Sequence, residues 1–221
     1  MTVLTRPDLD APLSTVMREG SQAEHTAAEN SSFMSELLAG RVNEAGYAAY
    51  LLRLRQVYAA IEETVCAHAH DPAVAAVLDT DLERLAAIDA DLDHWAPGGP
   101  RTVDSPAAAT YAARVRAGAA WAPLLVAHHY TRYLGDLSGG QAIGRILSRA
   151  FDLEAGVGTA FYAFPAIPKP KPYKDAYRAR LDALDLTVEE KQRVVDEVRV
   201  AFDLNQALFR ELGADLASYR R

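Results

Sequence analysis

Apolar residues recur every three to four positions along two long stretches of the chain, and this spacing is the strongest constraint on its fold. The stripe in residues 43–70 contains Tyr47, Tyr50, Leu51, Leu54, Val57, Tyr58, Ile61 and Val65, and that in residues 188–212 contains Val194, Val198, Ala201, Phe202, Leu208, Phe209 and Leu212. A period of 3.6 residues places such side chains on one face of an α-helix. No stretch alternates with a period of two for long enough to predict a sheet. The sequence therefore predicts an all-α helical bundle.

Proline and capping residues mark where the predicted helices begin. Asp71-Pro72 and Ser105-Pro106 each combine an N-cap side chain with a proline at the first helical position. Thr187 is followed three residues later by glutamate, which is the capping-box pattern. These signals predict helices that start at the two prolines and just after Thr187.

The length of 221 residues suits a single domain with a sizeable core. The proline-rich residues 164–172 (FPAIPKPKP) are predicted to be a non-helical connector. The segment that follows it is too short to form an independent core of its own. We therefore expect one domain over residues 1–221, with disorder at residues 1–10 and 213–221.

Charge and cysteine content exclude several classes of protein. The formal net charge of −7 is opposite to the basic surface that nucleic-acid binding requires, so no nucleic-acid partner is expected. The single cysteine, Cys66, excludes an internal disulfide and any CxxC motif. No apolar run approaches the roughly 20 residues that span a bilayer, and the first residues lack a signal-peptide core. We expect a cytoplasmic protein with no membrane partner.

A histidine and a glutamate four residues apart form the first candidate site. His25 and Glu29 share one face of a predicted helix, where the carboxylate could orient an imidazole that binds a metal or haem iron. The alternative is a surface ion pair. Arg18 lies seven residues before His25, about 10 Å along a helix axis, a suitable offset for a cation that holds a carboxylate at the edge of a large planar ligand.

Lys174 and Arg178 form a second basic pair with a spacing of four. Such a pair commonly covers a solvated helix face. The alternative is that both side chains reach the same anionic ligand edge as Arg18.

Residues 130–147 (YTRYLGDLSGGQAIGRIL) contain four glycines in a region that is otherwise helical. Gly135 and Gly139 lie on one helix face, where the lack of side chains lets a flat ligand approach the backbone or permits a bend. Close packing of two helices is the alternative. Asp136 and Arg132 could hold ordered water over a ligand together with the hydroxyl of Tyr58, or could simply form an i,i+4 ion pair.

Four segments carry a resemblance to a known family. Residues 124–141 (LLVAHHYTRYLGDLSGGQ) closely resemble the signature of the haem oxygenases, and residues 24–34 (EHTAAENSSFM) resemble their proximal-helix segment. Residues 173–184 and 201–212 also resemble that family. The resemblance implies a single all-α domain in which haem is sandwiched between a proximal helix and a kinked distal helix.

The resemblance also implies roles for individual residues. It makes His25 the iron ligand and Glu29 its hydrogen-bond partner. It gives Asp136, together with Arg132 and Tyr58, the catalytic role of organising distal water. The further residues implied in binding haem are Arg18, Tyr130, Gly135, Gly139, Lys174, Arg178, Phe202, Asn205 and Phe209.

The implied activity is oxidative cleavage of haem b, which serves as both cofactor and substrate, to biliverdin, CO and Fe²⁺. The reaction needs O2 and an external electron donor, for which a ferredoxin or a flavin reductase is expected. Because Tyr130, Lys174 and Arg178 match the common propionate-binding pattern, we expect α-meso cleavage to biliverdin IXα. A monomer that serves iron acquisition is expected. The alternative is a haem carrier that does not oxidise the ring, although a carrier would not need the distal polar residues.

Overall fold

The computed structural model describes residues 8–154 and 156–221, and over these ranges it contains helices but no strand beyond an isolated bridge between Val42 and Arg220. The all-α prediction is confirmed. The α-helices are α1 (Leu13–Gly20), α2 (Gln22–Glu29), α3 (Ser32–Leu38), α4 (Glu44–Ala67), α5 (Pro72–Ala75), α6 (Leu85–Trp95), α7 (Pro106–Gly118), α8 (Pro123–His129), α9 (Gln141–Ala150), α10 (Pro170–Asp182), α11 (Val188–Ala214) and α12 (Leu216–Tyr219). The described residues also form the 3-10 helices η1 (Thr80–Leu82) and η4 (Ala160–Tyr162) and the π-helical segments η2 (Tyr130–Leu134) and η3 (Asp136–Gly140).

The predicted helix starts are confirmed. The side chains of Asp71 and Ser105 accept hydrogen bonds from the first backbone N–H groups of α5 and α7, and each of these helices has proline in its first turn. Thr187 and Glu190 make both hydrogen bonds of a capping box at the start of α11. Each such cap stabilises its helix by about 1 kcal/mol.

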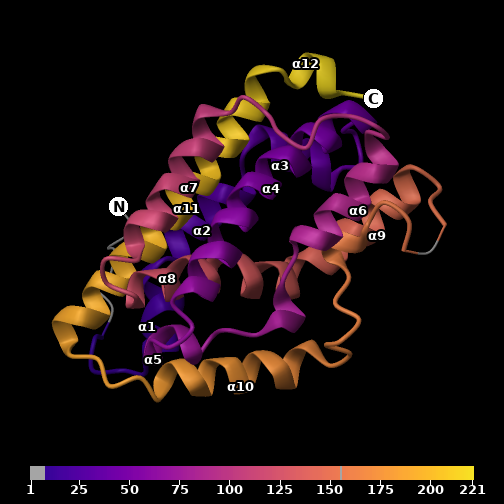
Figure 1. The fold of residues 1–221 in the computed structure, drawn as a ribbon. Helices are drawn as coiled ribbons and strands as arrows, with labels where there is room; N and C mark the ends of the chain where they lie inside the picture. Colours follow the sequence, from indigo (N-terminus) through magenta and orange to yellow (C-terminus); the bar gives the residue numbers. More distant parts are fainter. Residues whose placement is uncertain (1–7, 155) are drawn as a thin grey trace.

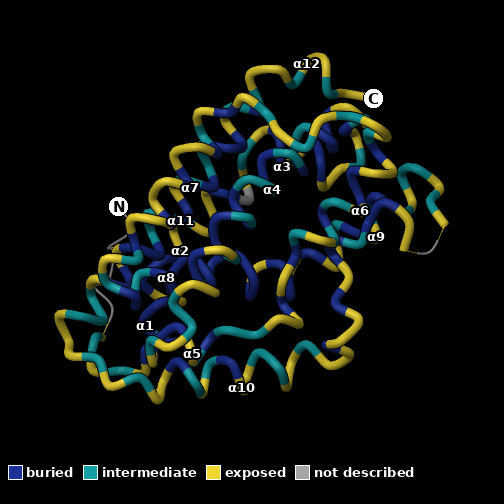
Figure 2. Tube along the Cα trace, viewed as in Figure 1, coloured by how far each residue is buried: buried dark blue, intermediate teal, exposed yellow. Residues whose placement is uncertain are grey.

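The long helices α4 and α11 organise the bundle. Helix α4 packs against α6 and α7, whereas α11 packs against α8, α2 and α7. Figure 1 shows α7 and α11 side by side along one flank of the molecule and α10 across one end. Buried apolar residues from all of these helices form one core, and exposed residues lie mainly on the outer faces of the helices (Figure 2).

Some details differ from the sequence-based predictions. Helix α10 begins at Pro170, inside the proposed connector, because proline is accepted in the first turn of a helix, where its missing N–H is not needed. The expected disorder at residues 213–221 is wrong: α11 continues to Ala214, α12 follows, and the Asn43 side chain donates hydrogen bonds to the carbonyl groups of Ser218 and Arg220. Residues 1–7 of the proposed N-terminal disorder lie outside the described residues. Cys66 is exposed.

Among the helices of the described residues, none combines the length and the apolar character that crossing a bilayer would require.

Candidate active site

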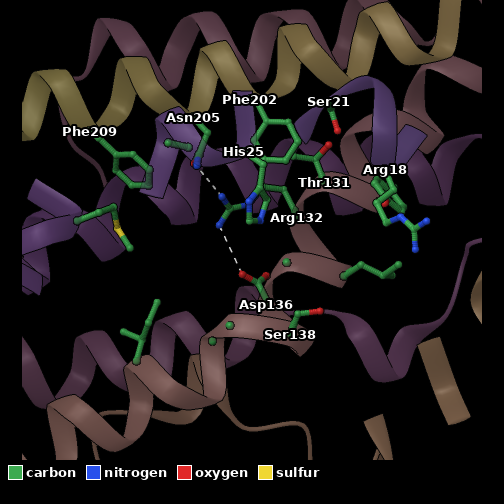
Figure 3. Close-up of a pocket in the computed structure, with 18 of the residues that line it drawn as sticks. Arg18, Ser21, His25, Thr131, Arg132, Asp136, Ser138, Phe202, Asn205 and Phe209 are labelled. Atoms are coloured by element: carbon green, nitrogen blue, oxygen red, sulfur yellow. Dashed lines mark hydrogen bonds and ion pairs between the residues drawn. The ribbon is translucent and has the colours of Figure 1, made fainter. Parts of the chain in front are cut away.

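A cavity of about 510 Å³ opens between α1, α2 and α11 on one side and the distal segment, residues 130–140, on the other. Its volume falls within the roughly 300–1,000 Å³ of small-molecule sites. Figure 3 shows Arg18 and Phe209 at opposite ends of this cavity, with His25 and Asp136 between them. The residues of the predicted site that line it are Arg18, His25, Tyr130, Arg132, Gly135, Asp136, Gly139, Arg178, Phe202, Asn205 and Phe209.

The proximal wall is formed by two short helices rather than one. The predicted helix is interrupted at Ser21, whose hydroxyl donates to the Met17 carbonyl oxygen at 2.7 Å, so Arg18 belongs to α1 and His25 to α2. The prediction that one continuous helix carries both residues is therefore wrong, although both line the cavity. The His25 ring meets the ring of Phe202 edge to face, with 5.5 Å between their centroids.

Glu29 is the last residue of α2, one turn after His25. Its side chain lies outside the part of the structure that is described. The hydrogen bond between Glu29 and His25 therefore stays a prediction.

The four glycines of the distal region have two different environments. A Cβ atom added to Gly135 or Gly139 would meet nothing within 4 Å, so their bare backbone faces the open cavity. A Cβ atom on Gly140 would lie 2.9 Å from the Tyr162 ring, and one on Gly144 would lie 3.2 Å from Tyr162 Cβ. The first pair therefore makes room for a ligand, and the second pair lets η4 pack against the distal region.

The distal segment itself is π-helical rather than α-helical over Tyr130–Leu134 and Asp136–Gly140, separated by Gly135. π-Helical turns are rare, are frequently found at functional sites and are a recognised cause of helix kinks. The glycine-rich sequence is compatible with this widened backbone, which follows the wall of the cavity.

A buried polar network lies behind the distal wall. The Tyr58 hydroxyl donates to Oδ2 of Asp136 and accepts from Nε of Arg132 at 3.1 Å. Arg132 also donates to Oδ1 of Asn205 at 2.8 Å, and its guanidinium lies 3.7 Å from Asp136 Oδ1. Burial raises the pKa of the Asp136 carboxyl, and the positive charge of Arg132 opposes this shift. Tyr58 is fully buried and does not line the cavity, so it acts on Asp136 from behind.

Basic side chains lie at the Arg18 end of the cavity. Arg178 and Tyr130 line it together with Arg18. Lys174 is not in the lining, but its Nζ donates to the Ser138 hydroxyl, itself a lining residue, at 3.0 Å. This end of the cavity can therefore bind carboxylates, whereas the Phe209 end carries no charged lining side chain apart from the distal network.

Two histidines anchor α8, which leads into the distal segment. Nε2 of His128 lies 2.8 Å from Oε1 of Glu197 on α11, and Nδ1 of His129 lies 2.8 Å from the Tyr177 hydroxyl on α10. Burial would raise the pKa of Glu197, but hydrogen bonds from His128 and Arg114 outweigh it and lower the pKa to about 2. These buried contacts hold the distal side of the cavity to α10 and α11.

Some lining residues are missing from the sequence-based site, and Tyr50 and Tyr162 are the aromatic side chains among them. Tyr50 belongs to the apolar stripe of residues 43–70, where its spacing predicts a core residue. Helical periodicity does not distinguish a face that packs against protein from one that lines a cavity. Tyr162 lies just before the proline-rich segment and carries no local signal of a site.

Comparisons with known proteins point to one family. The sequence profile of the family described as Heme oxygenase matches residues 11–211. Heme oxygenase 1 of Rattus norvegicus is 39% identical over 96% of this chain and 76% of the rat protein, and heme oxygenase 1 of Nostoc sp. is 37% identical over 94% of this chain and 89% of that protein. The crystal structure of heme oxygenase-1 from the cyanobacterium Synechocystis sp. in complex with heme has a TM-score of 0.89, with 37% identity over 94% of this chain and 95% of that chain. With a profile match and relatives that span nearly its whole length, the chain belongs to the heme oxygenase family.

Proposed function

We propose that this chain binds haem in the cavity and cleaves it with O2 and an external electron donor to biliverdin, CO and Fe²⁺. Membership of the family makes the chain a haem-degrading enzyme. The observation that carries the assignment to this cavity is its arrangement: His25 lies on one wall, and the other wall is bare at Gly135 and Gly139 with Asp136 between them.

The residues present fit haem, which has a flat apolar body, an iron at its centre and two carboxylates on one edge. The bare backbone at Gly135 and Gly139 leaves space for the flat ring. An imidazole is a common axial ligand of haem iron, so we assign His25 to the iron. Phe202 and Phe209 supply apolar contacts for the ring.

The carboxylates of the substrate are assigned to the basic end of the cavity. Arg18, Arg178 and Tyr130 line this end, and Lys174 lies just behind Ser138. Charged hydrogen bonds from arginine to carboxylate are strong and directional, so they fix which edge of the ring faces inward. This orientation supports cleavage at the edge opposite the carboxylates, which gives biliverdin IXα.

Bound haem supplies the iron at which O2 is reduced, and the distal residues supply protons. Because burial raises the pKa of Asp136, its carboxyl retains a proton to higher pH than an exposed aspartate. Tyr58 holds this carboxyl in place from the side away from the cavity, and Arg132 holds it from the cavity wall. We assign to Asp136 the task of holding an ordered water that delivers protons into the cavity.

Replacement of Asp136 by alanine tests this assignment. The Asp136→Ala variant is expected to bind haem with an intact Soret band but to form little biliverdin when reductant and air are supplied. Asp104→Ala, at an exposed position outside the cavity, is the matched control and should give the wild-type yield. A normal yield from Asp136→Ala would remove Asp136 from the mechanism. A wild-type protein that keeps its Soret band under these conditions would instead be a haem carrier.

We also infer that the enzyme is a cytoplasmic monomer that takes electrons from a ferredoxin or a flavin reductase and serves iron acquisition, as the family resemblance implies. Cell fractionation tests the cytoplasmic location, and size-exclusion chromatography tests the monomeric state. Reconstitution with each electron donor tests which donor the enzyme uses, and growth on haem as the only iron source tests the role in iron acquisition.

A further inference from the structure

The two arginines at the basic end of the cavity belong to different helices. Arg18 lies on α1 and Arg178 on α10, and both line the cavity, with Arg18 at one end of it in Figure 3. Each makes an ion pair with a neighbour on its own helix: Arg18 lies 3.3 Å from Glu19, and Arg178 lies 3.2 Å from Asp175. Such solvent-exposed pairs stabilise little. They also do not join the two helices, so another contact must set the spacing of the two arginines.

Asp182, the last residue of α10, joins this helix to the start of α1. Its Oδ1 accepts a hydrogen bond from the backbone N–H of Ser14 at 2.8 Å, and its Oδ2 accepts one from the Ser14 hydroxyl at 3.0 Å. Pro12, which precedes α1, offers no side-chain cap, so the Asp182 carboxylate takes that place from a distant part of the sequence. A carboxylate is favoured there because it satisfies an N–H without a helical partner and faces the positive end of the helix dipole.

This junction between Ser14 and Asp182 lies one helical turn from each arginine. Arg18 follows Ser14 by four residues, and Asp182 follows Arg178 by four residues, so each arginine shares a helix face with its end of the junction. Four residues correspond to about 6 Å along a helix axis. Since both arginines line the cavity, both turns lead from the junction to the cavity. The junction therefore sets how the two turns that carry the arginines lie relative to each other.

The remaining contacts of α1 do not replace this junction. Among the described residues, the only hydrogen bonds that join α1 to α10 are the two between Ser14 and Asp182. At the other end of α1, Nε of Arg199 donates to the Gly20 carbonyl oxygen at 2.7 Å, which ties α1 to α11 instead. The buried apolar face of α1 adds stability but little direction, because hydrophobic contacts are not directional. A helix of eight residues is also marginal by itself in water.

We propose that Asp182 is a positioning residue for the two carboxylates of the substrate. By capping α1 through Ser14, it holds Arg18 at the spacing from Arg178 that two carboxylates on one edge of a ring require. The inference rests on the proposed function, because it takes the carboxylates of haem to lie at the basic end of the cavity. When the junction is already formed in the ligand-free protein, binding does not have to order α1, and less of the interaction energy is lost.

The charge of Asp182 acts in the opposite direction. A negative charge one turn from Arg178 lowers the positive potential at this end of the cavity, so by charge alone its loss would strengthen the binding of carboxylates. Asp182 is exposed, and water and salt screen its charge. Positioning predicts that loss of Asp182 weakens the binding of carboxylates. The sign of the change therefore distinguishes the two effects.

The test measures binding without turnover. Haem and its dimethyl ester, which has the same ring and iron but no carboxylate, are titrated into the wild type, Asp182→Ala and Asp182→Asn, and the dissociation constants are read from absorbance. Asp182→Ala should weaken haem binding about fivefold, which corresponds to about 1 kcal/mol, and binding of the ester less than twofold. Asp182→Asn should lose less haem affinity, because its amide oxygen can still accept from the Ser14 N–H.

Asp71→Ala is the matched control. The Asp71 carboxylate also accepts hydrogen bonds from the first N–H groups of a helix, but that helix, α5, does not line the cavity. Both alanine variants should lower the Tm of the ligand-free protein by about 2–4 °C. Asp71→Ala should nevertheless leave both affinities unchanged, which separates the loss of any helix cap from the loss of the junction between α1 and α10.

Three results would overturn the proposal. The first is haem affinity in Asp182→Ala that is unchanged or higher. The second is an equal loss of affinity for haem and for its ester, which would mean that Asp182 supports the fold of the cavity as a whole. The third is a loss in Asp182→Asn as large as that in Asp182→Ala. Failure of the proposed function has a different signature, namely wild-type haem complex that stays intact with reductant and air while Asp182→Ala still weakens the binding of haem and not of its ester.

Discussion

Adjacent glycines in the distal segment give the sharpest test of how the cavity is built. Gly139 and Gly140 are neighbours in η3, and neither has the positive φ that would require glycine. A Cβ atom on Gly139 points into open space, whereas one on Gly140 lies 2.9 Å from Cδ1 of Tyr162. Alanine should therefore stabilise the ligand-free protein at Gly139 but not at Gly140.

The expected magnitudes follow from these contacts. Alanine in place of glycine inside a helix stabilises by about 1 kcal/mol, so Gly139→Ala should raise the Tm of the ligand-free protein by about 2–4 °C for a chain of this length. At Gly140 the same gain is opposed by overpacking of about 1–3 kcal/mol against the Tyr162 ring. The Tm values of the two variants should consequently differ by about 2–12 °C, with Gly140→Ala the lower.

Gly139→Ala, the variant with the higher Tm, should be the one that binds haem more weakly than the wild type. The new methyl group of Gly139→Ala occupies space that we assign to the haem ring, so this variant should bind haem at least about tenfold more weakly, a loss of about 1.4 kcal/mol. Differential scanning fluorimetry of the ligand-free variants and haem titration followed by absorbance measure the two effects. An equal loss of Tm in both variants, or wild-type haem affinity in Gly139→Ala, would refute the view that Gly139 is bare for the sake of a ligand.

Two further predictions concern single side chains. His25→Ala should remove the axial imidazole and shift the absorption spectrum of the haem complex, and added imidazole should restore it; an unchanged spectrum would mean that another residue is the ligand. Hydrogen bonds from His128 and Arg114 lower the pKa of Glu197 from its usual 4.5 to about 2, so its charge stabilises the fold above pH 4.5 and this contribution is lost as the pH falls towards 2. Glu197→Gln should reduce the free energy of unfolding in urea by on the order of 3 kcal/mol at pH 7, and the difference should shrink between pH 4.5 and 2. A difference that grows at low pH would contradict this reasoning.

The helical class of the fold and most helix starts could be predicted from the sequence because they depend on local chemistry. Period-3.6 apolar stripes define α4 and α11, and the caps at Asp71, Ser105 and Thr187 act within one turn of their own residue. The ordered structure of residues 213–221 depends instead on hydrogen bonds with Asn43, which lies far away in the sequence. No local sequence pattern predicts such contacts.

In the candidate site, too, features that depend on local residue types could be predicted, and those that depend on distant contacts could not. His25, Gly135 and Asp136 could be selected because their residue types are unusual for a helix that only packs. The break at Ser21 and the π-helical distal segment could not be predicted, because both depend on how the backbone fits neighbouring helices. Tyr50 has the spacing of a core residue, and only the three-dimensional structure places it at a cavity.

The two sides of the cavity are held to the bundle with unequal strength. The distal side is fixed through His128, His129 and Arg132, each hydrogen-bonded to a residue of another helix. Helix α2 has eight residues, and Ala28 is the one buried side chain among those described in it. An eight-residue helix is marginal by itself in water, so α2 keeps its place mainly by resting on α11. Thermal breathing should therefore displace the histidine-bearing side first, and a rigid disc-shaped molecule can be admitted or released without disturbing the side that carries Asp136.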